Sequence, residues 1–392
     1  MFITKELIKS LETATEFRLT LDQVAAPNFP ELLLAIQDAP KLQYLCLGAI
    51  FLGRWDEARV RLLAIAIERA PRLQTLSLSN SNLDAMKLAQ VKLLMAAIQG
   101  AGQLQALYLD DNALGDWEEA QVLCLMAAIE HAPQLRTLGL SNNKFCAWKE
   151  AQIRLLMTAI GRAPRLQSLD FSSFGGPLVS NNLGAWNEVK VELLATAIEH
   201  ASQLQTLDLH GNNLGAWNEV KVELLATAIE HAPQLQTLDL HGNNLGAWNE
   251  AQVRRLVTAI GHASQLQTLD LSNNEIYCWG SSSWGGKKFN LLIESIEMHP
   301  TLEAIRFEGM KEAGIDYILR DNHIKRAIES YNVVTSHQIP DELIDIIQQY
   351  SLKHDLYQFY KTKLETIRQS QNTTSVLSSV SEKDKTSAIK PA

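Results

Sequence analysis

Four aspartates recur at one place in a repeated motif of this sequence, and two histidines stand close behind them. The aspartates are Asp170, Asp208, Asp239 and Asp270, each the fifth residue of a copy such as LQTLDL. His210 and His241 each follow one of these aspartates by two positions. Carboxylates beside imidazoles can bind a basic protein segment, ligate a divalent cation or perform acid–base hydrolysis. We expect the first use, and we predict neither a metal site nor a carboxylate-dyad hydrolase.

Motifs of known catalytic sites are absent from the sequence. It contains no G-x-S-x-G, no H-E-x-x-H and no glycine-rich phosphate loop. The four cysteines, which have no C-x-x-C spacing and indicate free thiols in a reducing compartment, are Cys46, Cys124, Cys146 and Cys278. We therefore predict a protein that is not an enzyme and binds no cofactor.

The elements that position the aspartates come from an internal repeat. The motif L-x-x-L-x-L recurs in phase, mostly in steps of 31 residues. Its copies begin at Leu42, Leu73, Leu104, Leu135, Leu166, Leu204, Leu235 and Leu266, with a degenerate copy, LEAIRF, at Leu302. A shorter first repeat, FRLTL, begins at Phe17. Leucines that alternate with other residues predict a short strand whose leucine side faces inward.

A helix follows each strand in the pattern. In EVKVELLATAIEHA, apolar residues at three- and four-residue spacing share one helical face: Val222, Leu225, Ala228 and Ile229. Asn212, in the turn between strand and helix, is placed to bond backbone groups. One such unit cannot bury its apolar face alone, so neighbouring units must stack into a curved solenoid.

Several copies complete the longer pattern L-x-x-L-x-L-x-x-N-x-L, as in LQTLDLHGNNL over residues 204–214. This pattern resembles the leucine-rich repeat of the ribonuclease-inhibitor-like class, and the resemblance covers about residues 17–309. It implies an α/β solenoid, a horseshoe with parallel strands on the concave face and helices on the convex face. We divide the chain into a solenoid of about ten repeats (1–309), a helical C-terminal cap (310–370) and a disordered tail (371–392).

The strand residues between the leucines of such a solenoid face the concave surface, where partners usually bind. The four aspartates then form a negative stripe at the strand spacing of about 4.8 Å. Like charges this close cost stability, which favours a function for them, although duplication of one tolerated aspartate would give the same row. The predicted partner-binding residues are Tyr108, Asp110, Asp170, Thr206, Asp208, His210, Thr237, Asp239, His241, Asp270, Trp284 and Arg306.

Tryptophan also recurs in phase, in one slot just before each helix. The slot holds Trp55, Met86, Trp117, Trp148, Trp186, Trp217, Trp248 and Trp279. An aromatic ladder for a sugar or a single-stranded nucleic acid is one hypothesis, but the Met86 replacement favours packing between the strand and helix layers. Trp284 lies outside the slot, in the insertion YCWGSSSWGGKKF, and we expect it to be an exposed contact.

The sequence departs from the repeat at about residue 310. IPDELIDIIQQYSLKHDL (339–356) has the helical pattern of a cap over the last repeat. It also resembles the opening of an F-box, which implies contacts with the ubiquitin-ligase adaptor Skp1 through Ile339, Pro340, Leu343, Ile346 and Ile347. The later part of an F-box, which contains cysteine and tryptophan, has no counterpart in YKTKLETIRQS. Capping is therefore the first prediction and adaptor binding the alternative.

Charge and hydropathy limit the possible partners and locations. A net charge of −9 disfavours a general nucleic-acid binder, and no apolar run reaches the 18 residues of a membrane span. Charges interrupt every short apolar run of MFITKELIKSLETATEF, which therefore lacks the apolar centre of a Sec signal. We expect a monomer with a cytosolic fold.

The polar tail and the near-identical tandem units resemble the leucine-rich-repeat effectors that Legionella-type bacteria inject into host cells. This resemblance implies a virulence protein that a specialised secretion system delivers to the host cytoplasm. The sequence as a whole predicts a non-catalytic interaction module that binds a basic segment of a host protein on an acidic concave surface. The alternative is a substrate receptor that delivers its partner to a ubiquitin ligase.

Overall fold

A computed structural model of the chain describes residues 3–174, 180–276 and 285–306. The chain divides into two units, and all described residues lie in the first, Met1–Ile315. The predicted cap, the F-box-like segment with Ile339, Pro340, Leu343, Ile346 and Ile347, and the predicted tail lie outside the described residues.

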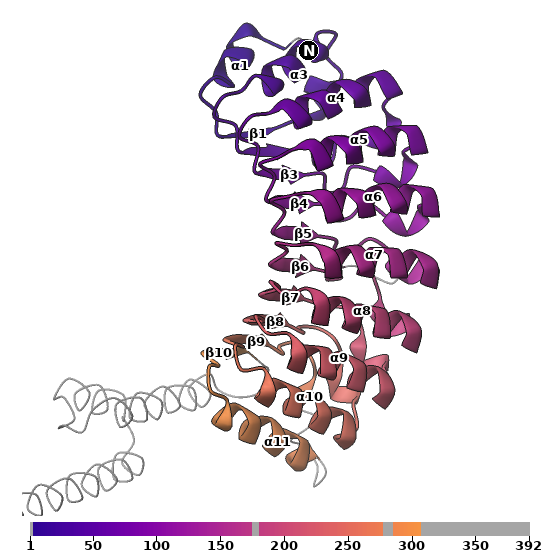
Figure 1. The fold of residues 1–392 in the computed structure, drawn as a ribbon, viewed down its shortest axis with the longest axis vertical. Coiled ribbons are helices and arrows are strands. Elements are labelled where there is room, and N and C mark those ends of the chain that lie inside the picture. The colour runs from indigo at the N-terminus through magenta and orange to yellow at the C-terminus, as the bar shows by residue number, and fades with distance from the viewer. Residues whose placement is uncertain (1–2, 175–179, 277–284, 307–392) are drawn as a thin grey trace, which may run out of the picture. The chain divides into compact units, whose positions relative to one another are not determined.

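One parallel sheet contains all ten described strands, in the order of the sequence (Figure 1). The strands are β1 (Glu16–Arg18), β2 (Tyr44–Cys46), β3 (Thr75–Ser77), β4 (Ala106–Tyr108), β5 (Thr137–Gly139), β6 (Ser168–Asp170), β7 (Thr206–Asp208), β8 (Thr237–Asp239), β9 (Thr268–Asp270) and β10 (Ala304–Arg306). Each strand pairs with the next in the same register, so that Leu207 stands beside Leu238 and Leu238 beside Leu269. The middle leucines form one buried row.

Helices cover the opposite side of the repeats from the strands (Figure 1). The described helices are α1 (Lys5–Ser10), α2 (Leu21–Val24), α3 (Phe29–Gln37), α4 (Glu57–Arg69), α5 (Leu88–Gly100), α6 (Glu119–His131), α7 (Glu150–Arg162), α8 (Glu188–His200), α9 (Glu219–His231), α10 (Glu250–His262) and α11 (Gly285–Met298). Short 3-10 turns lead into α4–α10: η1 (Leu52–Arg54), η2 (Leu83–Ala85), η3 (Leu114–Asp116), η4 (Phe145–Ala147), η5 (Leu183–Ala185), η6 (Leu214–Ala216) and η7 (Leu245–Ala247). This alternation of strand and helix confirms the predicted α/β solenoid.

The tryptophan slot belongs to the core. Each described tryptophan of the slot is at most 6% exposed, and Met86 is 3% exposed. The indole of Trp117 donates a hydrogen bond of 2.9 Å to the carbonyl of Leu83 in the preceding repeat, and Trp248 donates one of 3.0 Å to Leu214. An indole thus joins two repeats by packing and by one polar contact, which confirms the packing interpretation. Trp279 lies outside the described residues.

A buried ladder of asparagines fixes the turn that follows each strand. Asn212 donates from Nδ2 to the carbonyls of Phe171 (2.9 Å) and Leu209 (3.0 Å). Its own N–H donates to Oδ1 of Asn243 in the next repeat at 2.9 Å. Each amide therefore satisfies backbone groups of its own repeat and its neighbours, as the sequence predicts, and this holds the strands in one register. Among the described helices, none is long and apolar enough to cross a membrane.

Candidate binding surface on the concave face

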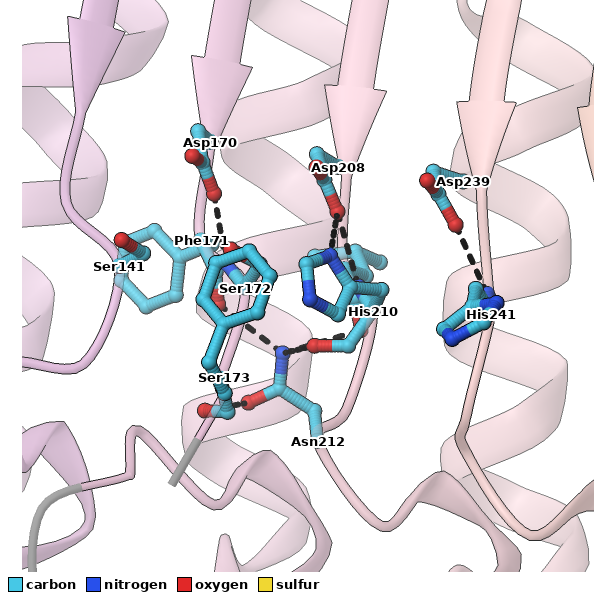
Figure 2. A network of polar contacts seen from close by, with 12 residues as sticks. Ser141, Asp170, Phe171, Ser172, Ser173, Asp208, His210, Asn212, Asp239 and His241 are labelled. Carbon is cyan, nitrogen blue, oxygen red and sulfur yellow. Dashed lines mark hydrogen bonds and ion pairs between the residues drawn. The ribbon is translucent and has the colours of Figure 1, made fainter. Parts of the chain in front are cut away.

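The strand register places the third residue of every strand in one row. Along the sheet this row contains Arg18, Cys46, Ser77, Tyr108, Gly139, Asp170, Asp208, Asp239, Asp270 and Arg306. We call its four consecutive aspartates the acidic row. Figure 2 shows three of them, Asp170, Asp208 and Asp239, on neighbouring strands and on the same side of the sheet. The sequence thus identified which side chains stand together.

Each carboxylate of the acidic row also has a local structural contact. One oxygen accepts the backbone N–H two residues later, at 2.9 Å in Asp170 and 3.0 Å in Asp208. Asp239 and Asp270 make the same contact at 2.8 and 2.9 Å. The side chain therefore closes the turn at the end of the strand. An asparagine has the same acceptor oxygen, so this contact requires an oxygen but not a negative charge.

The two histidines behind the acidic row differ in their contacts. His210 is only 9% exposed, and its Nδ1 lies 3.0 Å from Oδ1 of Asp208. Nδ1 of His241 lies 3.0 Å from the hydroxyl of Ser272. The two rings meet edge to face, with centroids 5.8 Å apart. His210 is thus a largely buried partner of an acidic side chain, and less accessible than its place in the row suggested.

The acidic row perturbs its own protonation equilibria. Burial raises the pKa of Asp170 and Asp239, and the neighbouring carboxylates add to the rise, against the hydrogen bonds from the backbone. Burial alone would lower the pKa of His210, but its hydrogen bond to Asp208 and the surrounding aspartates raise it above its ordinary value. Burial is thus the main cause of the raised pKa of the two aspartates, and the hydrogen bond to Asp208 is the main cause of the raised pKa of His210.

Within the described residues, one group has the donor set of a metal site: Asp208, His210 and Asp239. Each offers one ligand atom, and these atoms lie within 4.8 Å of one another. Oxygen and imidazole ligands suit a divalent transition metal. Nδ1 of His210 is, however, already hydrogen-bonded to Asp208, so these two side chains satisfy each other. We assign no metal to it.

The end of the acidic row toward the N-terminus is formed around Gly139. A β-carbon at this glycine would lie 2.7 Å from Cδ1 of Tyr108 and 2.8 Å from Oδ1 of Asp110. The missing side chain therefore leaves the space that the tyrosine ring and this carboxylate fill. Asp110 also accepts hydrogen bonds from the Ser79 hydroxyl (3.1 Å) and the Ser141 N–H (3.0 Å). Burial and then the charges of Asp110 and Asp170 raise the pKa of Tyr108.

Phe174 borders the acidic row and is the most exposed large apolar side chain in the described part of the chain, at 71%. Its ring meets that of His210 at 4.0 Å between centroids, nearly perpendicular. It stands within the first insertion, SSFGGPLVS (residues 172–180), of which residues 175–179 lie outside the described residues. An exposed aromatic ring beside a charged row is typical of a protein contact.

The remaining predicted residues flank the acidic row or lie at its far end. Thr206, Thr237 and Thr268 form the half-buried row on one side of it. Arg306, on the last strand, has a guanidinium nitrogen 3.6 Å from the Asp270 carboxylate. Its positive charge therefore offsets the negative charge at this end of the acidic row. Trp284 lies outside the described residues.

Sequence reasoning missed three features of this surface. The first is that Gly139 leaves space for the ring of Tyr108 on the neighbouring strand. A glycine next to a tyrosine in the same row hints at this, but only the strand pairing shows which ring fills the space. The contact between Phe174 and His210 joins repeats across an insertion that breaks the period. The third feature is the hydrogen bond that each aspartate accepts from the N–H two residues later, which the spacing of an Asx turn could have predicted.

One family model and one solved structure agree with this architecture. A family model described as Leucine Rich Repeat matches residues 265–286. The solved structure of the leucine-rich repeat-containing protein LegL7 from Legionella pneumophila is similar in fold, with a TM-score of 0.55 and 17% sequence identity. That match covers 89% of this chain and 95% of LegL7. The tropomodulin C-terminal domain of Caenorhabditis elegans matches 46% of this chain and 98% of its own, with 12% identity and a TM-score of 0.34. No curated protein matches in sequence.

Proposed function

We propose that this leucine-rich-repeat solenoid, which is similar in fold to LegL7, is a non-catalytic protein that binds a basic segment of a protein partner at the acidic row. The fold is typical of protein-interaction modules. The observation that carries the proposal is the acidic row, four carboxylates on four adjacent strands. A partner with lysine or arginine side chains would neutralise them.

The acidic row is costly in the free protein, which supports a binding role. Oxygens of Asp208 and Asp239 lie within 4.8 Å of each other. Two unit charges at this distance repel by about 1 kcal/mol in water and about 3 kcal/mol at an effective dielectric constant of ~20. Within the described residues, His210 and Arg306 pair with the row, one at Asp208 and one at Asp270. A basic ligand would remove the remaining repulsion.

The test uses an oligo-arginine peptide as the probe and the full-length chain. The double variant Asp208→Lys with Asp239→Lys reverses the charge of two central members of the acidic row. We expect it to abolish binding, and we expect binding by the unaltered protein to weaken steeply with salt. Its matched control is Glu119→Lys with Glu192→Lys, which makes the same change of charge at two exposed positions on α6 and α8. Equal affinity of the two double variants for the peptide would contradict the proposal.

We propose that the protein acts inside a host cell. The support is the similarity in fold to a Legionella pneumophila protein and the polar C-terminal tail of the sequence. A reporter enzyme fused to the full chain would measure this directly. Delivery into infected host cells that depends on the bacterial secretion system is the expected result, and reporter activity confined to the bacterium would contradict it.

A further inference from the structure

We infer that the outward side of α6 is a second binding surface, which takes an amphipathic α-helix of a protein partner with acidic residues on both edges of its apolar stripe. The surface lies on the side of the repeats that the helices cover, opposite the strands that carry the acidic row (Figure 1). The inference is therefore independent of the proposed function.

The first observation is that α6 is apolar on two opposite sides. No charged residue occurs from position 120 to position 129. The inward side packs in the core through Val122, Leu125, Met126 and Ile129. The outward side has alanine, leucine or cysteine at the spacing i, i+3, i+4 and i+7: Ala120, Leu123, Cys124 and Ala127. We call these four residues the outer stripe.

The outer stripe is open to solvent at its most apolar member. Leu123 is 49% exposed, and Ala120, one turn earlier, is exposed as well. A helix that is apolar all round is normally buried on all sides, because apolar surface in contact with water is unfavourable. This side of α6 therefore has the composition of an interface although Leu123 is half-exposed.

Leu123 also departs from the repeat. It is the fifth residue of its helix, and the fifth residue is exposed in each of the 13-residue helices α4–α10. Along the solenoid these residues are Arg61, Lys92, Leu123, Arg154, Glu192, Glu223 and Arg254. Every helix of this set except α6 has a charge there. The apolar surface is therefore a property of α6 and not of the repeated unit.

The second observation is that cations flank Leu123 on both neighbouring helices. Lys92 on α5 and Arg154 on α7 hold the same helical position, and α5 and α7 both contact α6. Lys92 lies close enough to the outer stripe to act on Cys124: burial raises the pKa of this thiol, and the charge of Lys92 opposes the rise. Two positive charges thus stand on either side of an apolar stripe.

These two cations differ from the others of their row in lacking an acidic partner. Arg61 pairs with the glutamate four residues earlier at 2.9 Å, and Arg254 does so at 2.8 Å. Lys92 has a leucine in that place, and the corresponding Glu150 before Arg154 accepts a hydrogen bond of 2.6 Å from Asn187. Within the described residues neither Lys92 nor Arg154 forms an ion pair.

Charge complementarity then selects the partner. A ligand that covers Leu123 and reaches both cations needs apolar side chains in its centre and carboxylates on both edges. An amphipathic helix has this arrangement, since charged residues beside an apolar stripe pair across helix–helix contacts. The outer stripe covers seven residue steps, about 10 Å, so it matches about two turns of a helix. Alanine at both ends of the stripe lets the backbone of the ligand approach closely.

An anionic membrane surface would also attract Lys92 and Arg154, but it fits the row less well. The row continues on α8 and α9 with Glu192 and Glu223, which are exposed. A flat bilayer would meet these carboxylates together with the two cations. A helix is about 10–12 Å wide, close to the spacing of packed helices, so it would contact α5, α6 and α7 alone.

The experiment measures the binding of three peptides of about 18 residues to the full-length chain, by fluorescence anisotropy. The first has leucines at i, i+3, i+4 and i+7 bordered by glutamates. The second has the same composition with the leucines spread around the helix. The third has lysine in place of every glutamate. We expect the first peptide to bind at least tenfold more tightly than either of the others.

Equal affinity of the three peptides would overturn the inference. Binding to phosphatidylserine vesicles without binding to the acidic peptide would also overturn it, in favour of a membrane. Self-association of the chain alone, seen by sedimentation and abolished by Leu123→Glu, would overturn it in favour of a second copy.

A substitution at the centre of the outer stripe tests the apolar contact. Leu123→Glu should weaken binding of the acidic peptide at least tenfold, and the fold should be preserved because the side chain is half-exposed. Val220→Glu is the matched control, since Val220 is 50% exposed on α9 and undergoes the same change of charge. Equal affinity of these two variants for the acidic peptide would refute the contact.

A charge reversal tests the two cations. Lys92→Glu with Arg154→Glu should abolish the preference for the acidic peptide and favour the lysine peptide instead. The control is Arg61→Glu with Arg254→Glu, which makes the same change at the same helical position outside the surface. The same loss of preference in both double variants would show an effect of net charge alone and contradict the inference.

The thiol of Cys124 reports where the peptide binds. Saturation with the acidic peptide should slow alkylation of Cys124 several-fold, measured by mass spectrometry. Alkylation of Cys146, a free thiol just before α7, should keep its rate. An unchanged rate at Cys124 would place the peptide elsewhere and overturn the inference.

The two binding surfaces can fail separately. Asp208→Lys with Asp239→Lys should leave affinity for the acidic peptide unchanged at physiological salt, where charges farther apart than about 8 Å are largely screened. Leu123→Glu should likewise leave binding of oligo-arginine unchanged. A loss of acidic-peptide binding in the aspartate variant would place this ligand on the strand side and contradict the assignment to α6.

Discussion

Asp239→Asn should make the protein more stable and a weaker binder at the same time. Asparagine keeps the oxygen that accepts the N–H of His241 at 2.8 Å, so the turn at the end of β8 is preserved. What the substitution removes is a negative charge between two others, Asp208 and Asp270. We expect these opposite effects if the charge of Asp239 attracts the ligand but destabilises the free protein.

The magnitude follows from the distances. Repulsion between Asp239 and Asp208, whose oxygens lie within 4.8 Å, amounts to about 1–3 kcal/mol. Exposure to solvent favours the lower value, and the attraction of His210 for Asp239 offsets part of it. We therefore expect the free energy of unfolding to rise by about 1 kcal/mol, which is about 2–4 °C in the midpoint of thermal unfolding for a domain of this size.

Thermal unfolding of the full chain at low and high salt measures this effect. The gain should shrink in about 1 M salt, where the Debye length falls to about 3 Å. Asp116→Asn is the matched control, because it removes one exposed charge that pairs with Lys144 instead of repelling a neighbour. That control should leave stability unchanged or slightly lower. A destabilised Asp239→Asn protein at low salt would refute the reasoning, because the carboxylate would then stabilise the fold.

Further predictions concern the core, the protonation of the site and the C-terminal segment. Trp217→Ala should cost about 3–5 kcal/mol of unfolding free energy, because it empties a buried slot and removes a hydrogen bond to Leu183; denaturant titration measures it. Because the pKa of His210 is raised, its contribution to stability is present below the ordinary histidine pKa and is lost as pH rises through the raised value. Stability of the unaltered protein relative to His210→Gln should therefore fall across this range, and a rise would contradict it. Affinity for a basic peptide should be lower below this range, where the added positive charge opposes the ligand; pH-independent affinity would contradict this. Gly139→Ala should displace Tyr108 and reduce peptide affinity, measured by anisotropy, without loss of fold. The full chain should not retain Skp1 in a pull-down; retention that is lost when residues 310–392 are deleted would establish the adaptor alternative.

The periodic part of the structure could be predicted from the sequence because its causes are local and repeated. Alternating leucines set the strand, and the apolar face of EVKVELLATAIEHA set the helix. The tryptophan slot could be assigned to packing from Met86 alone, since a thioether fills a gap but is a poor stacking surface. Repeated units also fix the register, which is why the acidic row could be written down before the strands were seen.

The accessibility and the contacts of the candidate site could not be predicted in the same way. His210 and His241 hold the same place in two adjacent repeats with the same local sequence, yet one pairs with Asp208 and the other with Ser272. The difference comes from the neighbouring repeats. His241 has Ser272 beside it in the next repeat, whereas the ring of Phe174, from the preceding repeat, packs against His210. Identical residues thus acquire different chemistry from neighbours one repeat away, and a pattern within one repeat does not record them.

The structure also bears on whether the acidic row was selected or only copied. Strands with Cys46, Ser77 or Gly139 in the same place form the same three-residue element, so the repeat does not require an aspartate there. The hydrogen bond that the aspartates do make needs an oxygen that asparagine also has. Asp170 stands in LQSLDFSS, a copy that has diverged, whereas Asp270 stands in HASQLQTLDL (262–271), which repeats residues 200–209 without change. At Asp170 an aspartate that the fold does not need persists where neighbouring residues have changed, which favours a role in binding, whereas duplication alone would place the other three aspartates.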